Sequence, residues 1–169
     1  MKNEHDFAAL FSGHFDKVYN LCRRIGVSSS AAQDIAQDVF LRYYESSGDF
    51  RGDSKPSTWL YRVAVNCCID HLRREARWQK KRNDMSHLEG SVLDSSDDVI
   101  VDSAVGMQIL KKLSPRNRSL LVLRSYLDLS YQEIAAVLGM KAESVGVQLT
   151  RARREAVTMA GEMGVFDEM

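Results

Sequence analysis

Several things are scarce in this sequence of 169 residues, and each absence narrows the choice of protein class. Only two prolines and few alternating β-branched runs occur, which argues against a β-sheet architecture. No apolar run approaches the roughly eighteen residues of a membrane span, and no secretory signal opens the chain, so we expect a cytoplasmic protein. Three cysteines and four scattered histidines make neither a disulfide framework nor a metal-ligand set. We therefore expect no metal, no cofactor and an all-helical fold.

The net charge of zero conceals alternating blocks of charge. Residues 51–82 hold nine basic and three acidic side chains, a net of +6. Residues 83–110 hold six acidic and no basic side chains, a net of −6, and residues 111–160 hold nine basic and four acidic ones, a net of +5. Two basic blocks divided by an acidic one indicate two nucleic-acid contacts joined by a linker. The alternative is ordinary solvation of charged helices.

Residues 130–156 predict two helices joined by a tight turn. Ser130 and Glu133 form a capping-box pair at the start, and Gly139 suits the left-handed end of the first helix. A second helix follows from about Ala142, and its apolar stripe recurs at helical spacing: Val145, Leu149, Ala152 and Ala156. Its other face is polar and basic: Ser144, Gln148, Arg151 and Glu155, with Arg153 and Arg154 beside them. This pattern predicts a helix-turn-helix whose second helix enters the DNA major groove; the alternative is a solvated amphipathic pair.

Apolar periodicity predicts five further helices. They cover residues 5–25 (ended by Gly26), 31–46 (capped by Ser30), 58–80, 98–113 and 115–126 (opened by Ser114 and Pro115). Between the third and fourth lies a linker without periodicity, residues 84–97. We expect an all-α protein of two small helical domains, residues 1–83 and 98–161, joined by a flexible acidic linker and followed by a tail, residues 162–169.

The helix over residues 58–80 carries one polar face. Five residues share it at steps of four, four, three and four: Arg62, Asn66, Asp70, Arg73 and Arg77. A basic helix behind an aromatic and glycine-bearing loop suits unstacked single-stranded DNA, because arginines meet phosphates while a base enters the loop. Trp59 has two interpretations, a contact to that base or a position in the core.

Four blocks of sequence carry a family resemblance. DIAQDVFLRYY (34–44), FRGDSKPSTWLYRVAVNCCIDHLRR (50–74) and LSPRNRSLLVLRSYLDLSYQEIAAVLGM (113–140) precede a basic recognition helix. Their order resembles that of the extracytoplasmic-function (ECF) group of bacterial RNA polymerase sigma factors over nearly the whole chain. The resemblance implies a protein that is not an enzyme, binds core polymerase, recognises two promoter elements and promotes DNA opening.

The resemblance also implies roles for individual residues. Docking on the clamp of the largest polymerase subunit would use Asp34, Gln37, Asp38, Phe40 and Arg42. Phe40 has two interpretations, a place on this docking face or a position in the core. The −10 element would meet Phe50, Arg51, Ser54, Lys55, Trp59, Arg62, Asn66, Asp70, Arg73, Arg74 and Arg77. The −35 element would meet Lys141, Ser144, Gln148, Arg151, Arg153 and Arg154. Further implied partners are the flap of the second-largest subunit and an anti-sigma factor, which could hold the otherwise monomeric chain at the membrane.

The recognition helix departs from many relatives at three positions. Gly146, Val147 and Gln148 stand where a basic residue followed by Ser-Arg is common. Glycine inside a helix costs about 1 kcal/mol relative to alanine. Glutamine suits adenine where arginine suits guanine, so we expect an unusual upstream element. Lys55 and Pro56 also depart from the expected loop.

Two other classes of function are weaker candidates. A self-sufficient helix-turn-helix regulator would bind palindromic duplex DNA without polymerase, but a sensor domain needs no second basic face. An enzyme would need a phosphate-binding glycine loop, metal-ligand spacing or a nucleophile motif, and the sequence contains none of these.

Overall fold

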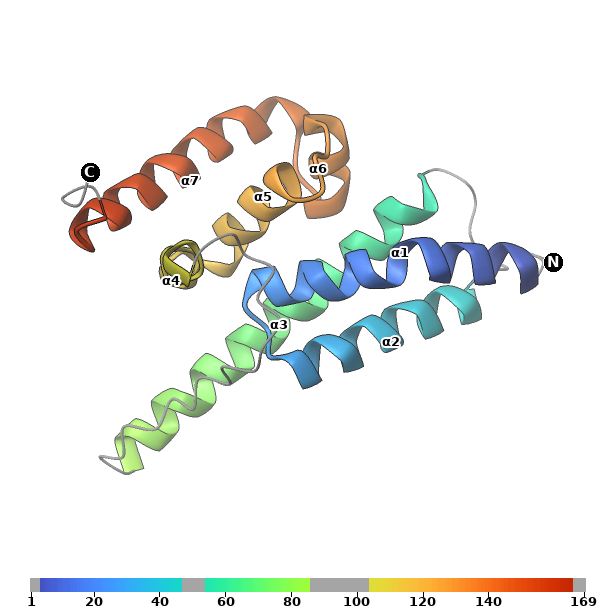
Figure 1. Cartoon of the computed structure of the whole chain (residues 1–169), viewed down its shortest axis with the longest axis horizontal. Coiled ribbons are helices and arrows are strands. Elements are labelled where there is room, and N and C mark those ends of the chain that lie inside the picture. Colours follow the sequence, from blue (N-terminus) through green and yellow to red (C-terminus); the bar gives the residue numbers. More distant parts are fainter. Residues whose placement is uncertain (1–3, 47–53, 86–103, 166–169) are drawn as a thin grey trace.

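The computed structural model describes residues 4–46, 54–85 and 104–165, and within these ranges every regular element is a helix (Figure 1). The helices are α1 (Glu4–Ile25), α2 (Ser29–Ser46), α3 (Pro56–Met85), α4 (Ala104–Lys112), α5 (Pro115–Ser125), α6 (Tyr131–Leu138) and α7 (Ala142–Glu162). The all-helical fold predicted from the sequence is confirmed.

The helices α1, α2 and α3 pack against one another as the N-terminal unit. Gly26 ends α1 with a φ of +110°, a conformation that favours glycine. The predicted start of α2 is wrong, because the helix already begins at Ser29 and the Ser28 hydroxyl accepts a bond of 3.4 Å from the Ala31 amide. Three consecutive serines can each cap, so the sequence alone does not select one. The third helix also extends beyond the predicted limit at residue 80, to Met85.

The C-terminal unit, α4 to α7, contains the predicted helix-turn-helix. The Ser130 hydroxyl accepts from the Glu133 amide (3.1 Å), and the Ser130 amide donates to the Glu133 carboxylate (2.8 Å). Gly139 ends α6 with a φ of 63°, and α7 follows at Ala142. The capping box and the glycine turn are therefore confirmed. Of the helix predicted over 98–113, residues 98–103 lie outside the described residues, and the described part begins at Ala104.

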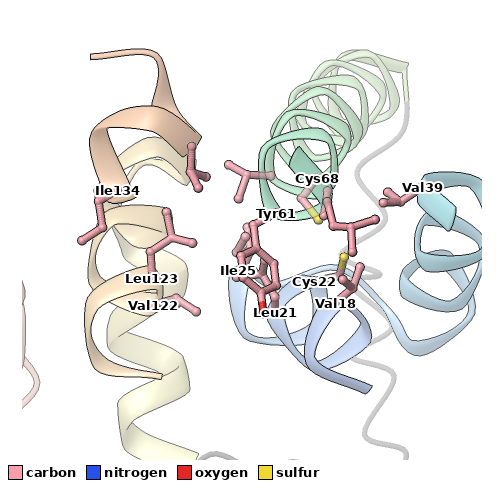
Figure 2. Packing of buried hydrophobic residues seen from close by; sticks show 14 of the residues in the cluster. Val18, Leu21, Cys22, Ile25, Val39, Tyr61, Cys68, Val122, Leu123 and Ile134 are labelled. Atoms are coloured by element: carbon pink, nitrogen blue, oxygen red, sulfur yellow. The ribbon is translucent and has the colours of Figure 1, made fainter. Parts of the chain in front are cut away.

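One continuous core joins the two units (Figure 2). Figure 2 shows Tyr61 of α3 between two groups of apolar side chains. Leu21 and Ile25 lie on its α1 side, and Leu123 of α5 and Ile134 of α6 lie on the other. All four of these aliphatic side chains are fully buried, and Tyr61 is 5% exposed. The two units thus share an interior, which the sequence pattern left open.

A buried arginine of α5 fixes the contact between the units. Arg118 is only 6% exposed. Its guanidinium donates to the carbonyl oxygen of Ile25 in α1, and within the C-terminal unit to those of Leu110 (2.6 Å), Lys111 (2.9 Å) and Leu113 (3.0 Å). Burial lowers the pKa of Arg118, but arginine starts from so high a value that it stays charged. Four carbonyls replace the water that this cation loses.

The N-terminal end of α3 adds polar contacts across the same boundary. The Arg62 Nε donates to the carbonyl oxygen of Ala136 in α6 at 2.9 Å. Lys55 Nζ lies 3.5 Å from the Glu133 carboxylate, and the Arg24 guanidinium stacks 4.0 Å from the centroid of the Tyr126 ring. These contacts place the helix-turn-helix directly against the start of α3.

Replacement of Arg118 should destabilise the whole chain. Arg118→Ala leaves several buried carbonyls without a donor, and we expect a loss of about 2–5 kcal/mol in the free energy of unfolding. Chemical denaturation followed by circular dichroism measures this loss. Arg116→Ala, at an exposed position of the same helix, is the matched control and should change stability by less than about 0.5 kcal/mol. Equal effects of the two substitutions would contradict the assigned role of Arg118.

Candidate nucleic-acid interface

One face of α7 is buried and the opposite face is open. Val145, Leu149 and Ala152 are fully buried, which confirms these three positions of the predicted apolar stripe. Ala156, the fourth, is half-buried. Four of the residues predicted to meet the −35 element are exposed: Lys141, Arg151, Arg153 and Arg154. The other two, Ser144 and Gln148, are half-buried. This part of α7 thus presents an amide, a hydroxyl and cations to solvent, a suitable set for base edges and phosphates.

The structure supplies a reason for the unusual Gly146. A Cβ at this position would lie 3.3 Å from Cε2 of Tyr131, the first residue of α6. The Tyr131 ring also receives the Arg124 guanidinium, 5.7 Å from its centroid. Glycine thus lets α6 and α7 approach with an aromatic ring between them. The sequence signal was present, a glycine within a predicted helix, but its partner could not be identified without the fold.

A second cationic face lies on α3. Residues on the predicted polar side are exposed to solvent: Asn66, Asp70, Arg73, Arg74 and Arg77. Four of them, with Ala76, line an open hollow of about 760 Å³. Two arginines lie along their own helix, because Arg74 Nε donates to the Asp70 carbonyl and Arg77 Nε to the Arg73 carbonyl, each at 3.4 Å. Both guanidinium groups keep further N–H donors for a phosphate.

Three other residues predicted to contact DNA lie against protein in this structure. Arg62 and Lys55 contact α6 through Ala136 and Glu133. The ring of Trp59 packs edge-on against Tyr43 at 5.5 Å between centroids, so of its two interpretations the structure favours the core. Ser54 is half-buried, and Phe50 and Arg51 lie outside the described residues. The structure therefore leaves the C-terminal part of the predicted −10 surface open. At its start Arg62 is half-buried against α6, and Lys55 is bonded to Glu133 but keeps 75% of its side chain exposed.

The Lys55–Glu133 pair lies at this start of the predicted −10 surface. Hydrogen bonds from Ser130, and then the proximity of Lys55, lower the pKa of the Glu133 carboxyl. Because the pKa is lower in the folded chain, the Glu133 carboxylate stabilises the fold at pH values above its ordinary pKa of about 4.3. That stabilisation is lost as the pH falls through the lowered pKa of the folded chain. At neutral pH the carboxylate is therefore charged and serves both the α6 cap and Lys55.

Of the α2 side chains that were predicted to dock on polymerase, only some are exposed to solvent. Asp34, Gln37 and Arg42 are exposed, and Arg42 forms an ion pair of 2.8 Å with half-buried Asp38. Phe40 is different, because it is 1% exposed and its ring packs against rings of α1. The expectation that Phe40 lies on the docking surface is corrected: this side chain is core.

Sequence reasoning missed an apolar residue on the exposed side of α2. Leu41 is 55% exposed and lies one turn after Gln37. It falls outside the buried stripe of the helix, and this was the available signal. Leu41 and Gln37 therefore form the exposed polar and apolar parts of one surface.

Cys22 and Cys68 are buried and Cys67 is half-buried, and all three carry free thiols. The pKa of the Cys68 thiol is raised by its hydrogen bond with Cys22 and by burial, so it stays protonated at neutral pH. In the described parts of the chain, no three His, Cys, Asp or Glu side chains are grouped as metal ligands. No helix of these parts is long and apolar enough to cross a membrane.

Comparisons with known proteins agree with this arrangement of two units. The family model for Sigma-70 region 2 matches residues 10–78. The family model for Sigma-70, region 4 matches residues 107–155. RNA polymerase sigma factor YlaC of Bacillus subtilis is 32% identical over 161 residues, covering 92% of each chain. The ECF RNA polymerase sigma factor SigW of the same organism is 32% identical over 164 residues, covering 90% of this chain and 88% of SigW.

Two solved structures share the fold. CnrH, in complex with the cytosolic domain of CnrY, has a TM-score of 0.70 at 24% identity, covering 95% of this chain and 91% of CnrH. The sigma factor RpoE, in complex with the anti-sigma factor NepR from Bartonella quintana, has a TM-score of 0.70 at 19% identity, covering 89% of this chain and 94% of RpoE. Because both family models and these relatives match most of its length, the chain belongs to the RNA polymerase sigma factors of the ECF group. This class is a non-catalytic initiation factor, and the resemblance found in the sequence is confirmed.

Two side chains of α7 should differ in what they contribute to DNA binding. With core polymerase bound, Gln148→Ala should relax the preference at one upstream base pair by about 1–3 kcal/mol, because an amide reads a base edge. Arg151→Ala should weaken binding to all sequences alike and reduce the salt dependence by about one phosphate contact. Competition between promoter variants at several salt concentrations measures both. An unchanged base preference in the Gln148 variant would remove this residue from sequence reading.

Proposed function

We propose that this sigma factor holds core polymerase at promoters through two separate DNA contacts. Residues 1–83 would bind the −10 element through α3, and residues 98–161 would bind the −35 element through α7. The observation that carries the proposal is the pair of exposed cationic faces, one on each unit, each beside polar groups able to read bases. Neither unit has an obvious use for such a face in packing, because both faces point away from the shared core.

The proposed mechanism is positional. Arginines of α3 and α7 contact phosphates and supply affinity that falls with salt. Asn66 and Asp70 of α3 and Gln148 of α7 contribute polar groups for bases. The loop between α2 and α3 would hold a flipped base, offsetting an unstacking cost of a few kcal/mol. Transcription chemistry stays with the polymerase, and the sigma factor supplies the location and helps open the duplex.

The contact between the units adds a step to this mechanism. Arg62 and Lys55 belong to the predicted −10 surface, yet each bonds to α6 in the described arrangement. Full use of that surface requires these two bonds to be exchanged for contacts to DNA. We propose that binding to polymerase and promoter separates the start of α3 from α6. The free chain is then a closed form and the initiating chain an open one.

Polymerase docking is proposed for the exposed side of α2. Asp34, Gln37 and Leu41 would meet the clamp of the largest subunit, and Arg42 and Asp38 would flank them as an ion pair. The C-terminal unit would meet the flap of the second-largest subunit. An exposed leucine among polar groups suits a non-obligate interface, where an apolar centre is surrounded by a polar rim.

Regulation by an anti-sigma factor is part of the proposal. CnrH and RpoE, which share the fold, are both seen in complexes, RpoE with the anti-sigma factor NepR. The polar contact between α3 and α6 offers such a partner a way to act, because a protein that stabilises the closed form withholds Arg62 from DNA. We place the active chain in the cytoplasm with the polymerase, and the inhibited chain at the membrane with its anti-sigma partner.

Transcription in vitro tests the function directly. The chain with bacterial core polymerase should initiate at a discrete set of sites in a genomic library, and mapped start sites give both promoter elements. Charge reversal by Arg73→Glu and Arg74→Glu should reduce opening at least tenfold while binding to core enzyme is retained, because both residues lie on the DNA face of α3. Permanganate reactivity of the melted bases measures opening.

The control for this experiment is the double charge reversal Lys17→Glu and Lys112→Glu, at exposed positions of α1 and α4 outside α3 and α7. Absence of initiation at every site, with the chain bound to core enzyme, would overturn the proposed function. Permanganate reactivity that stays unchanged in the Arg73 and Arg74 variant would overturn only the role of α3.

Docking through α2 has its own test. Gln37→Ala combined with Leu41→Ala should weaken binding to core polymerase about tenfold or more, because truncation at the centre of an interface typically costs more than about 1 kcal/mol. A titration of labelled chain with core enzyme measures the change. Asp16→Ala, at an exposed position of α1, is the control. An affinity unaltered by the double substitution would refute this docking face.

A further inference from the structure

The last part of α3 extends beyond the rest of the molecule. Residues 73–83 are all exposed, whereas the first half of the helix is packed on α1, α2 and α6 (Figure 1). A helical segment without a buried face gains little from tertiary packing, so its side chains are free to contact a partner. We call residues 73–83 the α3 extension.

Trp78 is the aromatic residue of this extension. It is 63% exposed, although tryptophan is among the residues that gain most from burial. It lies about five helical turns after Leu60, which is fully buried, and therefore on the same side of α3. The apolar side of the helix thus continues past the end of the bundle, where α1 and α2 no longer cover it. This side of the extension carries an indole ring open to solvent.

Cations surround the indole ring. Arg74, Arg77, Lys80 and Lys81 line an open hollow with Trp78, of about 560 Å³. Lys81 Nζ lies 5.6 Å from the centroid of the ring. Residues 73–82 hold six basic and one acidic side chain, a net of +5. The positive charge favours an anionic ligand in this hollow. The indole ring favours a ligand that also has a flat aromatic face to stack on it.

Single-stranded DNA meets both demands. Its phosphates are anions, and its unpaired bases expose the faces that stack on aromatic side chains. Duplex DNA offers the phosphates but keeps its base faces inside the stack, and an acidic peptide offers carboxylates without a matching ring. Arg74 and Lys81 are seven residues apart, about 10 Å along the helix, so the cations can follow a strand past the ring.

We propose that Trp78 is a stacking platform for a base of single-stranded DNA, with Arg74, Arg77 and Lys81 holding the adjacent phosphates. The proposal rests on the proposed function and deepens it, because the extension belongs to the helix assigned to the −10 element, and Arg74 and Arg77 of that assignment lie beside Trp78. It adds a contact beyond the residues that the family resemblance assigned. The strand opened at the promoter would thereby pass along the whole second half of α3.

The extension is exposed in the closed form, so the free full-length chain can be tested. The chain has two tryptophans, and Trp59→Phe leaves Trp78 as the only indole reporter. The probe is an oligothymidylate of about 16 nucleotides, near the upper site size of single-strand binding modules. Quenching of Trp78 fluorescence reports stacking, and anisotropy of the labelled oligonucleotide gives the affinity.

We expect saturable quenching of Trp78 by the single strand. In the wild-type background, Trp78→Ala should weaken binding of the oligothymidylate about tenfold, within the range given by loss of one stacked base. Trp78→Phe should recover most of the affinity, which a merely charged surface would not explain. Lys81→Ala should weaken binding and flatten its salt dependence, whereas Lys17→Ala on α1 should do neither.

Three results would overturn the platform. The first is an affinity for oligothymidylate that Trp78→Ala leaves within twofold. The second is quenching of Trp78 by a duplex of the same length at equal or lower concentration, which would make the extension a duplex contact. The third is equal quenching by polyglutamate, which would make it an acidic-protein contact. Initiation in vitro separates this failure from failure of the proposed function, because wild-type chain would still initiate with core polymerase.

Discussion

A single buried cation determines how the two units of this sigma factor meet. The Arg118 guanidinium has left water, and a charge in an apolar interior is tolerated only when its donors are satisfied. Its four carbonyl partners come from the end of α1 and from α4 and the turn that follows it. Gly26 is part of the same arrangement, because a Cβ there would lie 2.6 Å from Arg118 Nη1. The apolar contacts around Tyr61 bury the rest of the same boundary.

That geometry divides the functional surface. The recognition side of α7 and the second half of α3 point outward, while the first turns of α3 lie on α6. The divided surface suits a protein whose partners arrive in sequence. Exposed cations can attract DNA and polymerase over several ångströms, and the covered residues become available only when a more favourable set of contacts replaces those to α6. In the proposed mechanism, the closed form makes promoter binding depend on the polymerase.

Local features were predictable from the sequence, and features that depend on distant partners were not. The capping box at Ser130, the turn at Gly139 and the stripe through Val145 depend on neighbouring residues, and all three are confirmed. The burial of Phe40 depends on the rings of α1, and the hydrogen bond of Arg62 depends on α6, so periodicity within one helix left Phe40 open between surface and core and placed Arg62 on the exposed polar face. Arg118 shows the same limit, because a lone arginine in an amphipathic helix predicts solvent.

The continuity of α3 has a mechanical consequence. It is one unbroken helix of 30 residues, with a length of about 45 Å. Its first turns contact the helix-turn-helix and its last turns carry Trp78. Because the helix between them is unbroken, a rotation of one end moves the other end with it. Pivoting the helix by about 10° at one end would displace the other by about 8 Å, from its length. An inhibitor that grips the C-terminal unit could therefore aim the far tip away from an opened strand without ever touching it.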